Sequence, residues 1–147
     1  MSGGVDEVST PNPQLPTPKH VLVVDDSPVN RSVLKAFLRR AGVAEVDLAG
    51  DGVEALAALD SAVKNGNPHD FVFSDFWMPN MNGLELVERL RADPRFSRLR
   101  MFAVTADTEF GKDVRARLFN GILLKPLTYS RLVDAFLTGK ETDSGNV

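Results

Sequence analysis

Short apolar runs alternate with amphipathic segments along most of this chain, and this alternation most constrains its fold. Most of the runs are rich in Val, Leu, Phe or Ile, as expected of strands that are buried on both faces. They lie at 20–24, 44–49, 70–74, 99–104 and 122–124. Strand–helix alternation of this kind predicts an α/β fold of three layers, in which a doubly wound, five-stranded parallel sheet lies between helices.

A helical pattern follows each of these runs. Ser27 is a suitable N-cap and Pro28 a suitable first residue for the first helix, whose apolar stripe ends before Gly42. The segment at 109–119 is the weakest helix candidate, because Gly111 lies inside it. The other helices are predicted at 52–64, 83–93 and 129–137.

The two ends of the chain differ in composition from its middle. Residues 1–18 contain four prolines among Gly, Ser and Thr, and such a segment cannot bury enough apolar surface to become ordered. Residues 139–147 are similarly polar. We therefore expect one folded domain at 19–138, a disordered tail at 1–18 and a flexible tail at 139–147.

Composition excludes several classes of function. The net charge of -3 argues against a general nucleic-acid surface, which is normally basic. The absence of cysteine excludes disulfides, thiolate metal sites and a cysteine nucleophile, and two histidines are too few for a histidine-rich metal site. No apolar run is long enough to span a membrane and no signal peptide opens the sequence, so a cytoplasmic protein is expected.

Polar side chains directly follow four of the predicted strands. Asp25 and Asp26 follow the first, Asp75 the third, Thr105 the fourth and Lys125 the fifth. Taken singly, each has a simpler interpretation, because Asp often caps turns, Thr bonds to the backbone and Lys-Pro forms solvated loops. The carboxyl ends of parallel strands share one edge of the sheet, however, and ligands bind there. The five residues together therefore predict a site.

Three carboxylates at one edge would repel one another and raise one another's pKa values. A Mg²⁺ ion and the Lys125 ammonium would remove this conflict, since Mg²⁺ prefers one or two carboxylates together with water and phosphate oxygens. Asp75 could then attack a phosphoryl group and form an aspartyl phosphate, with Thr105 donating a hydrogen bond to a phosphoryl oxygen. The sequence has no P-loop and no glycine-rich phosphate cradle, so the phosphoryl donor must arrive already activated.

Four segments then carry a resemblance to a known family: VLVVDDSPVNRSVL, SDFWMPNMNGLEL, FAVTAD and ILLKPL. In this order they resemble the receiver (CheY-like) domain of two-component response regulators, over about residues 20–138. The resemblance implies a flavodoxin-like sheet of order 2-1-3-4-5. It also implies a protein that takes a phosphoryl group from a phosphohistidine and switches protein contacts, and that is not an enzyme for an external substrate. The opening DDSPVNR is most similar to receivers of hybrid histidine kinases and phosphorelays.

The resemblance also implies a role for each site residue. Asp75 is the phosphoacceptor, Thr105 the switch hydroxyl and Lys125 the lysine that pairs with the phosphate. The Mg²⁺ ligands that it implies are Asp26, Asp75, the backbone carbonyl of Trp77 and, through water, Asp25. Asn30 is either a further residue of this site or simply a residue of the first helical turn.

Three features of the sequence depart from the family pattern. Ile122 stands where many receivers have an aromatic partner of the switch threonine. The 20 residues from Thr105 to Lys125 form a rather short interval, which predicts a trimmed or displaced helix and puts any assumed dimer mode in doubt. Trp77 is bulky for its position, and its ring either shields the phosphoryl group from water or only covers a surface patch.

The expected partner is a histidine kinase or a histidine phosphotransfer protein. It would dock near the first helix, where Arg31, Lys35, Arg39 and Arg40 line the side away from the apolar stripe. A row of charges of this kind also fits a merely solvated face. No DNA-binding domain, nucleic-acid partner or membrane partner is predicted, and a monomer or a weak homodimer is expected.

Two other functions fit parts of the sequence. The first is a phosphatase with an aspartate nucleophile, but such enzymes usually have a second Asp two residues later, where this chain has Trp77. The second is a receiver-like interaction module that no longer takes phosphate, and the retention of Asp26, Asp75, Thr105 and Lys125 counts against it.

Overall fold

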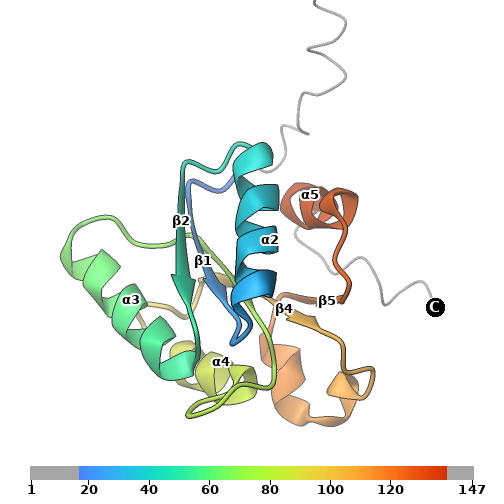
Figure 1. Ribbon diagram of the computed structural model, residues 1–147. Coiled ribbons are helices and arrows are strands. Elements are labelled where there is room, and N and C mark those ends of the chain that lie inside the picture. Colours follow the sequence, from blue (N-terminus) through green and yellow to red (C-terminus); the bar gives the residue numbers. More distant parts are fainter. Residues whose placement is uncertain (1–16, 139–147) are drawn as a thin grey trace, which may run out of the picture.

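The computed structural model describes residues 17–138, which form a parallel sheet between two layers of helices (Figure 1). The sheet has five strands in the order β2-β1-β3-β4-β5, and every neighbouring pair is parallel. The strands are β1 (His20–Val24), β2 (Glu45–Ala49), β3 (Phe71–Ser74), β4 (Arg100–Thr105) and β5 (Gly121–Leu124). The predicted fold class and strand order are both confirmed.

Two separate apolar cores hold the layers together. The α-helices are α2 (Pro28–Arg40), α3 (Gly52–Lys64), α4 (Gly83–Arg91) and α5 (Tyr129–Thr138). Buried side chains of α2 and α5 pack with one face of the sheet, whereas those of α3 and α4 pack with the other. Figure 1 shows α2 next to α5 and α3 next to α4.

The central strand β3 contributes to both cores, because successive side chains of a strand point to opposite faces. Phe71 and Phe73 face the core of α2 and α5, and Val72 faces the core of α3 and α4. The Phe71 ring stacks on Phe73 at a centroid distance of 4.8 Å and on Phe102 of β4 at 5.4 Å. This aromatic packing fixes the position at which β3 ends, directly before Asp75.

The helix starts that the sequence predicts are present. The Ser27 hydroxyl accepts a hydrogen bond from the backbone N–H of Asn30, and Pro28 is the first residue of α2. Asn82 and Glu85 form a reciprocal capping box at the start of α4. After α2, Gly42 has a φ of 100°, a left-handed conformation that suits glycine.

The α-helix predicted at 109–119 is wrong. This segment forms two short 3₁₀ helices, η1 (Phe110–Lys112) and η2 (Val114–Leu118). Asp113 interrupts it, because its side chain accepts a hydrogen bond of 2.9 Å from the backbone N–H of Arg115 and so caps η2. The short interval between Thr105 and Lys125 therefore does correspond to a reduced helix.

Residues 1–16 and 139–147, which include nearly all of the two predicted tails, lie outside the described residues. Within 17–138, no helix is both long enough and apolar enough to cross a membrane.

Candidate functional site

Three aspartates meet at the carboxyl ends of β1 and β3. The backbone N–H of Asp25 donates to the carbonyl of Ala49 at the end of β2, and that of Asp75 donates to the carbonyl of Val24 at the end of β1. Carboxylate oxygens of Asp25, Asp26 and Asp75 consequently lie within 4.8 Å of one another. The sequence prediction that these residues share one edge of the sheet is confirmed.

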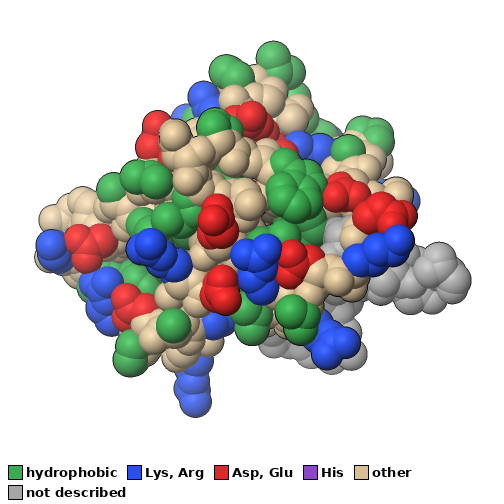
Figure 2. All heavy atoms as spheres, turned by 90° about the horizontal axis from the view of Figure 1, so that it is seen from below, with side chains coloured by type: hydrophobic (Ala, Val, Ile, Leu, Met, Phe, Trp, Pro, Cys, Tyr) green, Lys and Arg blue, Asp and Glu red, His purple; other side chains and the backbone are tan. Residues whose placement is uncertain are grey.

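Lys125 lies between two of these carboxylates. Its Nζ donates to Asp25 Oδ2 at 2.9 Å and to Asp75 Oδ2 at 3.0 Å. The backbone N–H of Lys125 donates to the carbonyl of Thr105, so the pairing of β4 with β5 sets the start of the lysine side chain. Figure 2 views the molecule from the end to which the strands point, and acidic side chains gather around a basic one near the middle of that face.

Burial and neighbouring charges act in opposite directions on Asp75. Burial raises the pKa of Asp75, Lys125 lowers it by hydrogen bonding and charge, Asp25 raises it by repulsion, and on balance the pKa lies above its usual value. Burial lowers the pKa of Lys125, but hydrogen bonds and attraction from Asp25 and Asp75 outweigh burial and raise it overall. The cluster thus has three carboxylates, of which the Lys125 ammonium contacts two, those of Asp25 and Asp75.

The residues present fit a magnesium ion. The donor atoms are carboxylate oxygens from Asp25, Asp26 and Asp75, close enough together for one ion to bind more than one of them. Asp26 is exposed whereas Asp25 is buried, so the cluster lies at the surface and is open to water. Mg²⁺ prefers this combination of few carboxylates and open positions.

A glycine lets α4 begin directly beside Asp75. The backbone N–H of Gly83 donates to the carbonyl of Phe76 at 2.7 Å. A Cβ atom at Gly83 would overlap the backbone carbonyl oxygen of Asp75. The residue therefore has to be glycine for the chain to turn from Asp75 into α4 in this way.

Thr105 and Trp77 are connected through a residue that the sequence analysis did not single out, Asp107. The Thr105 side chain is buried, and its Oγ1 accepts a hydrogen bond of 3.0 Å from the backbone N–H of Asp107. The Asp107 carboxylate accepts a hydrogen bond of 2.8 Å from Trp77 Nε1. The position of Asp107 two residues after Thr105 was the available signal, since such residues commonly form side-chain turns.

The three predicted modulating residues lie in different surroundings. Trp77 is 52% exposed and is held at its indole N–H. The side-chain amide of Asn30 lies 3.5 Å from Asp25 Oδ2, at the margin of a hydrogen bond. Ile122 is half-buried and packs against the core of α3 and α4.

The sequence predicts that the basic residues of α2 line one side of the helix, but they do not form one continuous exposed row. Arg31 is half-buried and donates to the backbone carbonyl of Asp25 at 2.7 Å, so it supports the acidic cluster. Arg39 is exposed and donates to the carbonyl of Ala44, and Arg40 lies over the ring of Tyr129. Lys35 is half-buried.

A largely apolar cavity of about 500 Å³ lies beside Lys125, between α2 and the chain that leads into α5. The lining residues include Val33, Leu34, Phe37, Val104 and Leu127, with Asp25 and Lys125 also contributing. Because Val29 and Val33 of α2 are exposed, this region offers apolar surface next to the acidic cluster.

Comparison with known proteins identifies the family of this chain. Residues 21–137 match the response regulator receiver domain. The chemotaxis protein CheY of Pseudomonas aeruginosa is 36% identical over 110 residues, which cover 74% of this chain and 85% of CheY. CheY1 of Helicobacter pylori is 39% identical over 112 residues, which cover 74% of this chain and 86% of CheY1.

Solved structures show the same relationship. TrrA of Thermotoga maritima, in complex with Mg²⁺ and BeF, superposes with a TM-score of 0.70 at 29% identity, over 79% of this chain and 94% of TrrA. CheY4 of Vibrio cholerae superposes with a TM-score of 0.69 at 31% identity, over 80% of this chain and 94% of CheY4. The chain therefore belongs to the response regulator receiver domains, the CheY-like proteins of two-component signalling.

Proposed function

We propose that this receiver domain accepts a phosphoryl group on Asp75 from a phosphohistidine of a histidine kinase or a histidine phosphotransfer protein. The observation that carries the proposal is the position of Lys125 Nζ, 2.9 Å from Asp25 and 3.0 Å from Asp75 within a cluster of three carboxylates. In such a cluster, the Lys125 ammonium can pair with an anionic phosphoryl group directly beside Asp75, the carboxylate that attacks phosphorus.

The reaction follows from the groups at this edge of the sheet. An oxygen of ionised Asp75 attacks phosphorus, the phosphorus–nitrogen bond of the donor breaks, and its electron pair returns to the histidine nitrogen. Lys125 and the Thr105 hydroxyl stabilise the transferred group by charge and by hydrogen bonding. Mg²⁺, which Asp26, Asp75 and the Trp77 carbonyl would hold directly and Asp25 through water, would offset charge on the phosphoryl oxygens. The Mg²⁺ in the TrrA structure supports the use of this ion.

The phosphorylated protein would act by changing its contacts with other proteins. It would not convert an external substrate. Thr105 Oγ1 accepts a hydrogen bond from the backbone N–H of Asp107, and its O–H would donate to the new phosphoryl group. A movement of Thr105 toward that group would therefore be passed to Asp107, which also holds Trp77. Phosphorylation at Asp75 would in this way reach the surface through two neighbouring loops. The proposed protein is thus a switch that catalyses only its own phosphorylation and dephosphorylation, and works as a monomer or a weak homodimer.

The partner would dock over α2 and the cavity beside Lys125. Exposed Val29 and Val33 supply apolar contact next to the acidic cluster, and Arg39 offers an exposed positive charge farther along the helix. A helical phosphohistidine protein with an apolar face and acidic flanks would match this surface.

Electrophoresis in a phosphate-binding gel tests the proposal. After incubation with acetyl phosphate and Mg²⁺, the protein should migrate more slowly, and the shift should be lost with EDTA or in Asp75→Asn. Asp60→Asn is a matched control, because Asp60 lies on α3 with Arg95 and Lys64 as partners and away from the cluster. A shift that persists in Asp75→Asn would contradict the proposal. If the wild-type protein bound its kinase but showed no shift, the alternative of an interaction module that no longer takes phosphate would be favoured.

A further inference from the structure

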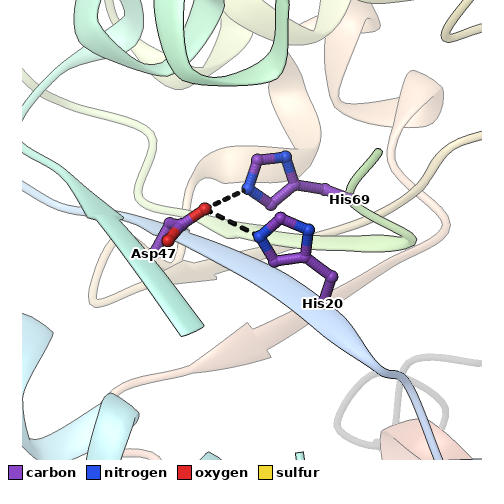
Figure 3. A group of neighbouring side chains, drawn as sticks. All are labelled: His20, Asp47 and His69. Carbon is purple, nitrogen blue, oxygen red and sulfur yellow. Dashed lines mark hydrogen bonds and ion pairs between the residues drawn. The ribbon is translucent and has the colours of Figure 1, made fainter. Parts of the chain in front are cut away.

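The two histidines of the chain lie side by side, although they are far apart in the sequence (Figure 3). His20 is the first residue of β1, and His69 precedes β3. Their rings stack at a centroid distance of 3.9 Å, and both side chains are nearly buried. The Nε2 atom of each ring lies 2.8 Å from the same oxygen, Oδ2 of Asp47 on β2. Two buried imidazoles and one carboxylate therefore converge on a single point.

The hydrogen bonds around His20 leave one proton position in conflict. His20 Nδ1 lies 2.9 Å from the backbone carbonyl of Asn67, which can only accept, so Nδ1 carries a hydrogen. A neutral ring then has a lone pair on Nε2, and this lone pair faces the Asp47 oxygen. A positive ion between Nε2 and the carboxylate would resolve this conflict.

His69 presents one ring nitrogen to the cluster, since its Nε2 lies 2.8 Å from Asp47 Oδ2. His69 Nδ1 is buried and has no hydrogen-bond partner within the described part of the chain. A neutral imidazole, with a lone pair on the nitrogen that faces the cluster, is the form that binds metals.

The donor set distinguishes this cluster from the aspartates at the carboxyl edge. Two imidazole nitrogens and one carboxylate suit Zn²⁺ and similar transition metals, whereas Mg²⁺ prefers oxygen ligands alone. The three donor atoms lie within 4.8 Å of one another. The bond from His20 Nδ1 to the Asn67 carbonyl is also the contact that orients metal-binding histidines in known sites.

An ion could reach the cluster from solvent. The Asp47 side chain is half exposed, and a cavity of about 320 Å³ opens beside it. His20, Asp47, Glu45 and Asn67 contribute to the lining of this cavity. Glu45 accepts a hydrogen bond of 2.9 Å from the Asn67 side chain and so supports the loop that orients His20, while adding negative charge near the entrance. Three protein ligands would leave a fourth position for water.

We propose that His20, Asp47 and His69 form a binding site for a divalent transition metal, with Zn²⁺ as the best match. The ion would connect β1, the edge strand β2 and the loop before β3, and would stabilise the folded domain by binding the native arrangement only. The site lies toward the amino-terminal ends of the strands, since His20 is the first residue of β1 and His69 precedes β3, whereas Asp25 and Asp75 follow the strand ends.

Calorimetric titration of Zn²⁺ into untagged protein, in the presence of excess Mg²⁺ to occupy the aspartate cluster, tests the site. One Zn²⁺ per chain should bind. The affinity should fall by more than about tenfold in Asp47→Asn and in His69→Gln, because mutation of residues that only orient a metal ligand already costs about tenfold or more. Asp60→Asn, a half-exposed aspartate on α3, is the matched control and should bind as wild type. Circular dichroism verifies that each variant is folded.

Nitrogen NMR on the wild-type protein keeps the test independent of any variant. All imidazole signals come from His20 and His69, because the chain has only these two histidines. Zn²⁺ should shift the Nε2 resonances of both rings and leave His20 Nδ1 protonated. Unchanged Nε2 signals at millimolar Zn²⁺ would overturn the proposal. Zn²⁺ binding that Mg²⁺ displaces, or that survives in both cluster variants, would overturn it as well.

Discussion

Trp77 Nε1 donates a hydrogen bond of 2.8 Å to the carboxylate of Asp107, which joins the loop after β3 to the loop after β4. The backbone N–H of Asp107 in turn donates to Thr105 Oγ1 at 3.0 Å. Trp77, beside the proposed phosphoacceptor Asp75, is thus hydrogen-bonded to Asp107. Asp107 in turn binds the proposed switch hydroxyl of Thr105. Trp77 is 52% exposed, so its ring contacts the core only in part, edge-on against the buried Phe76 ring at a centroid distance of 6.3 Å. The bond to Asp107 is the second contact that sets its position.

We predict that Trp77→Ala shortens the lifetime of the phosphorylated state several-fold, because water then reaches the phosphoryl group more easily. Trp77→Phe should shorten it too, since the phenyl ring lacks the N–H that Asp107 holds. The decay of purified phosphorylated protein, followed on phosphate-binding gels, measures this lifetime. If Trp77→Ala lost phosphate no faster than wild type, the ring would only cover a surface patch.

The second prediction concerns Lys125, whose ammonium competes with Mg²⁺ for the carboxylates of Asp25 and Asp75. Lys125→Met removes that positive charge, so the variant should bind Mg²⁺ more tightly than wild type by a few-fold, while its phosphorylation by acetyl phosphate slows. Fluorescence of Trp77, the single tryptophan of the chain, provides the Mg²⁺ titration. Arg98→Met, at an exposed position before β4, is a control for loss of one positive charge. Weaker Mg²⁺ binding in Lys125→Met would show that the lysine does not oppose the ion.

Much of this arrangement could be predicted from the sequence, because it follows from local chemistry and a topological rule. The cap at Ser27 and the apolar runs indicate where elements begin, and parallel strands bring Asp25, Asp75 and Lys125 to one edge. These positions needed no knowledge of side-chain packing.

The features that the sequence did not reveal depend on contacts between distant segments or on competing local bonds. The stacking of His20 on His69 arises from strand pairing and from the loop before β3, and neither residue has a motif around it. The 3₁₀ segments replace a helix because the Asp113 side chain takes a backbone N–H, which an apolar pattern does not show. The link from Trp77 to Asp107 likewise joins two loops that only the fold brings together.

The third prediction is a pH dependence that follows from the raised pKa of Asp75. A carboxyl whose pKa is higher in the folded than in the unfolded state binds protons more tightly when folded. Its contribution to stability is therefore fully present below the ordinary value of 3.8 and is lost as pH rises through the folded pKa. At neutral pH, Asp75→Asn should therefore be more stable than wild type, because the neutral amide avoids burial of the carboxylate charge.

Urea unfolding at several pH values measures this difference. The advantage of Asp75→Asn should shrink as pH falls toward 3.8, because the folded protein then takes up a proton at Asp75 more readily than the unfolded chain does. Phosphorylation by acetyl phosphate should weaken over the same fall in pH, since only ionised Asp75 attacks phosphorus. An Asp75→Asn protein that is less stable than wild type at neutral pH would contradict the raised pKa.

The last prediction concerns Gly83, where a Cβ atom would overlap the Asp75 carbonyl oxygen. Gly83→Ala should destabilise the domain by about 1–3 kcal/mol, the usual cost of overpacking, because either α4 or the backbone of Asp75 has to move. It should also slow phosphorylation, since displacement of Asp75 alters its distance from Lys125. Gly111→Ala is the matched control, because no atom lies within 4 Å of a Cβ placed there. Urea unfolding and phosphate-binding gels measure the two effects, and a Gly83→Ala protein as stable and as active as Gly111→Ala would show that this turn tolerates a side chain.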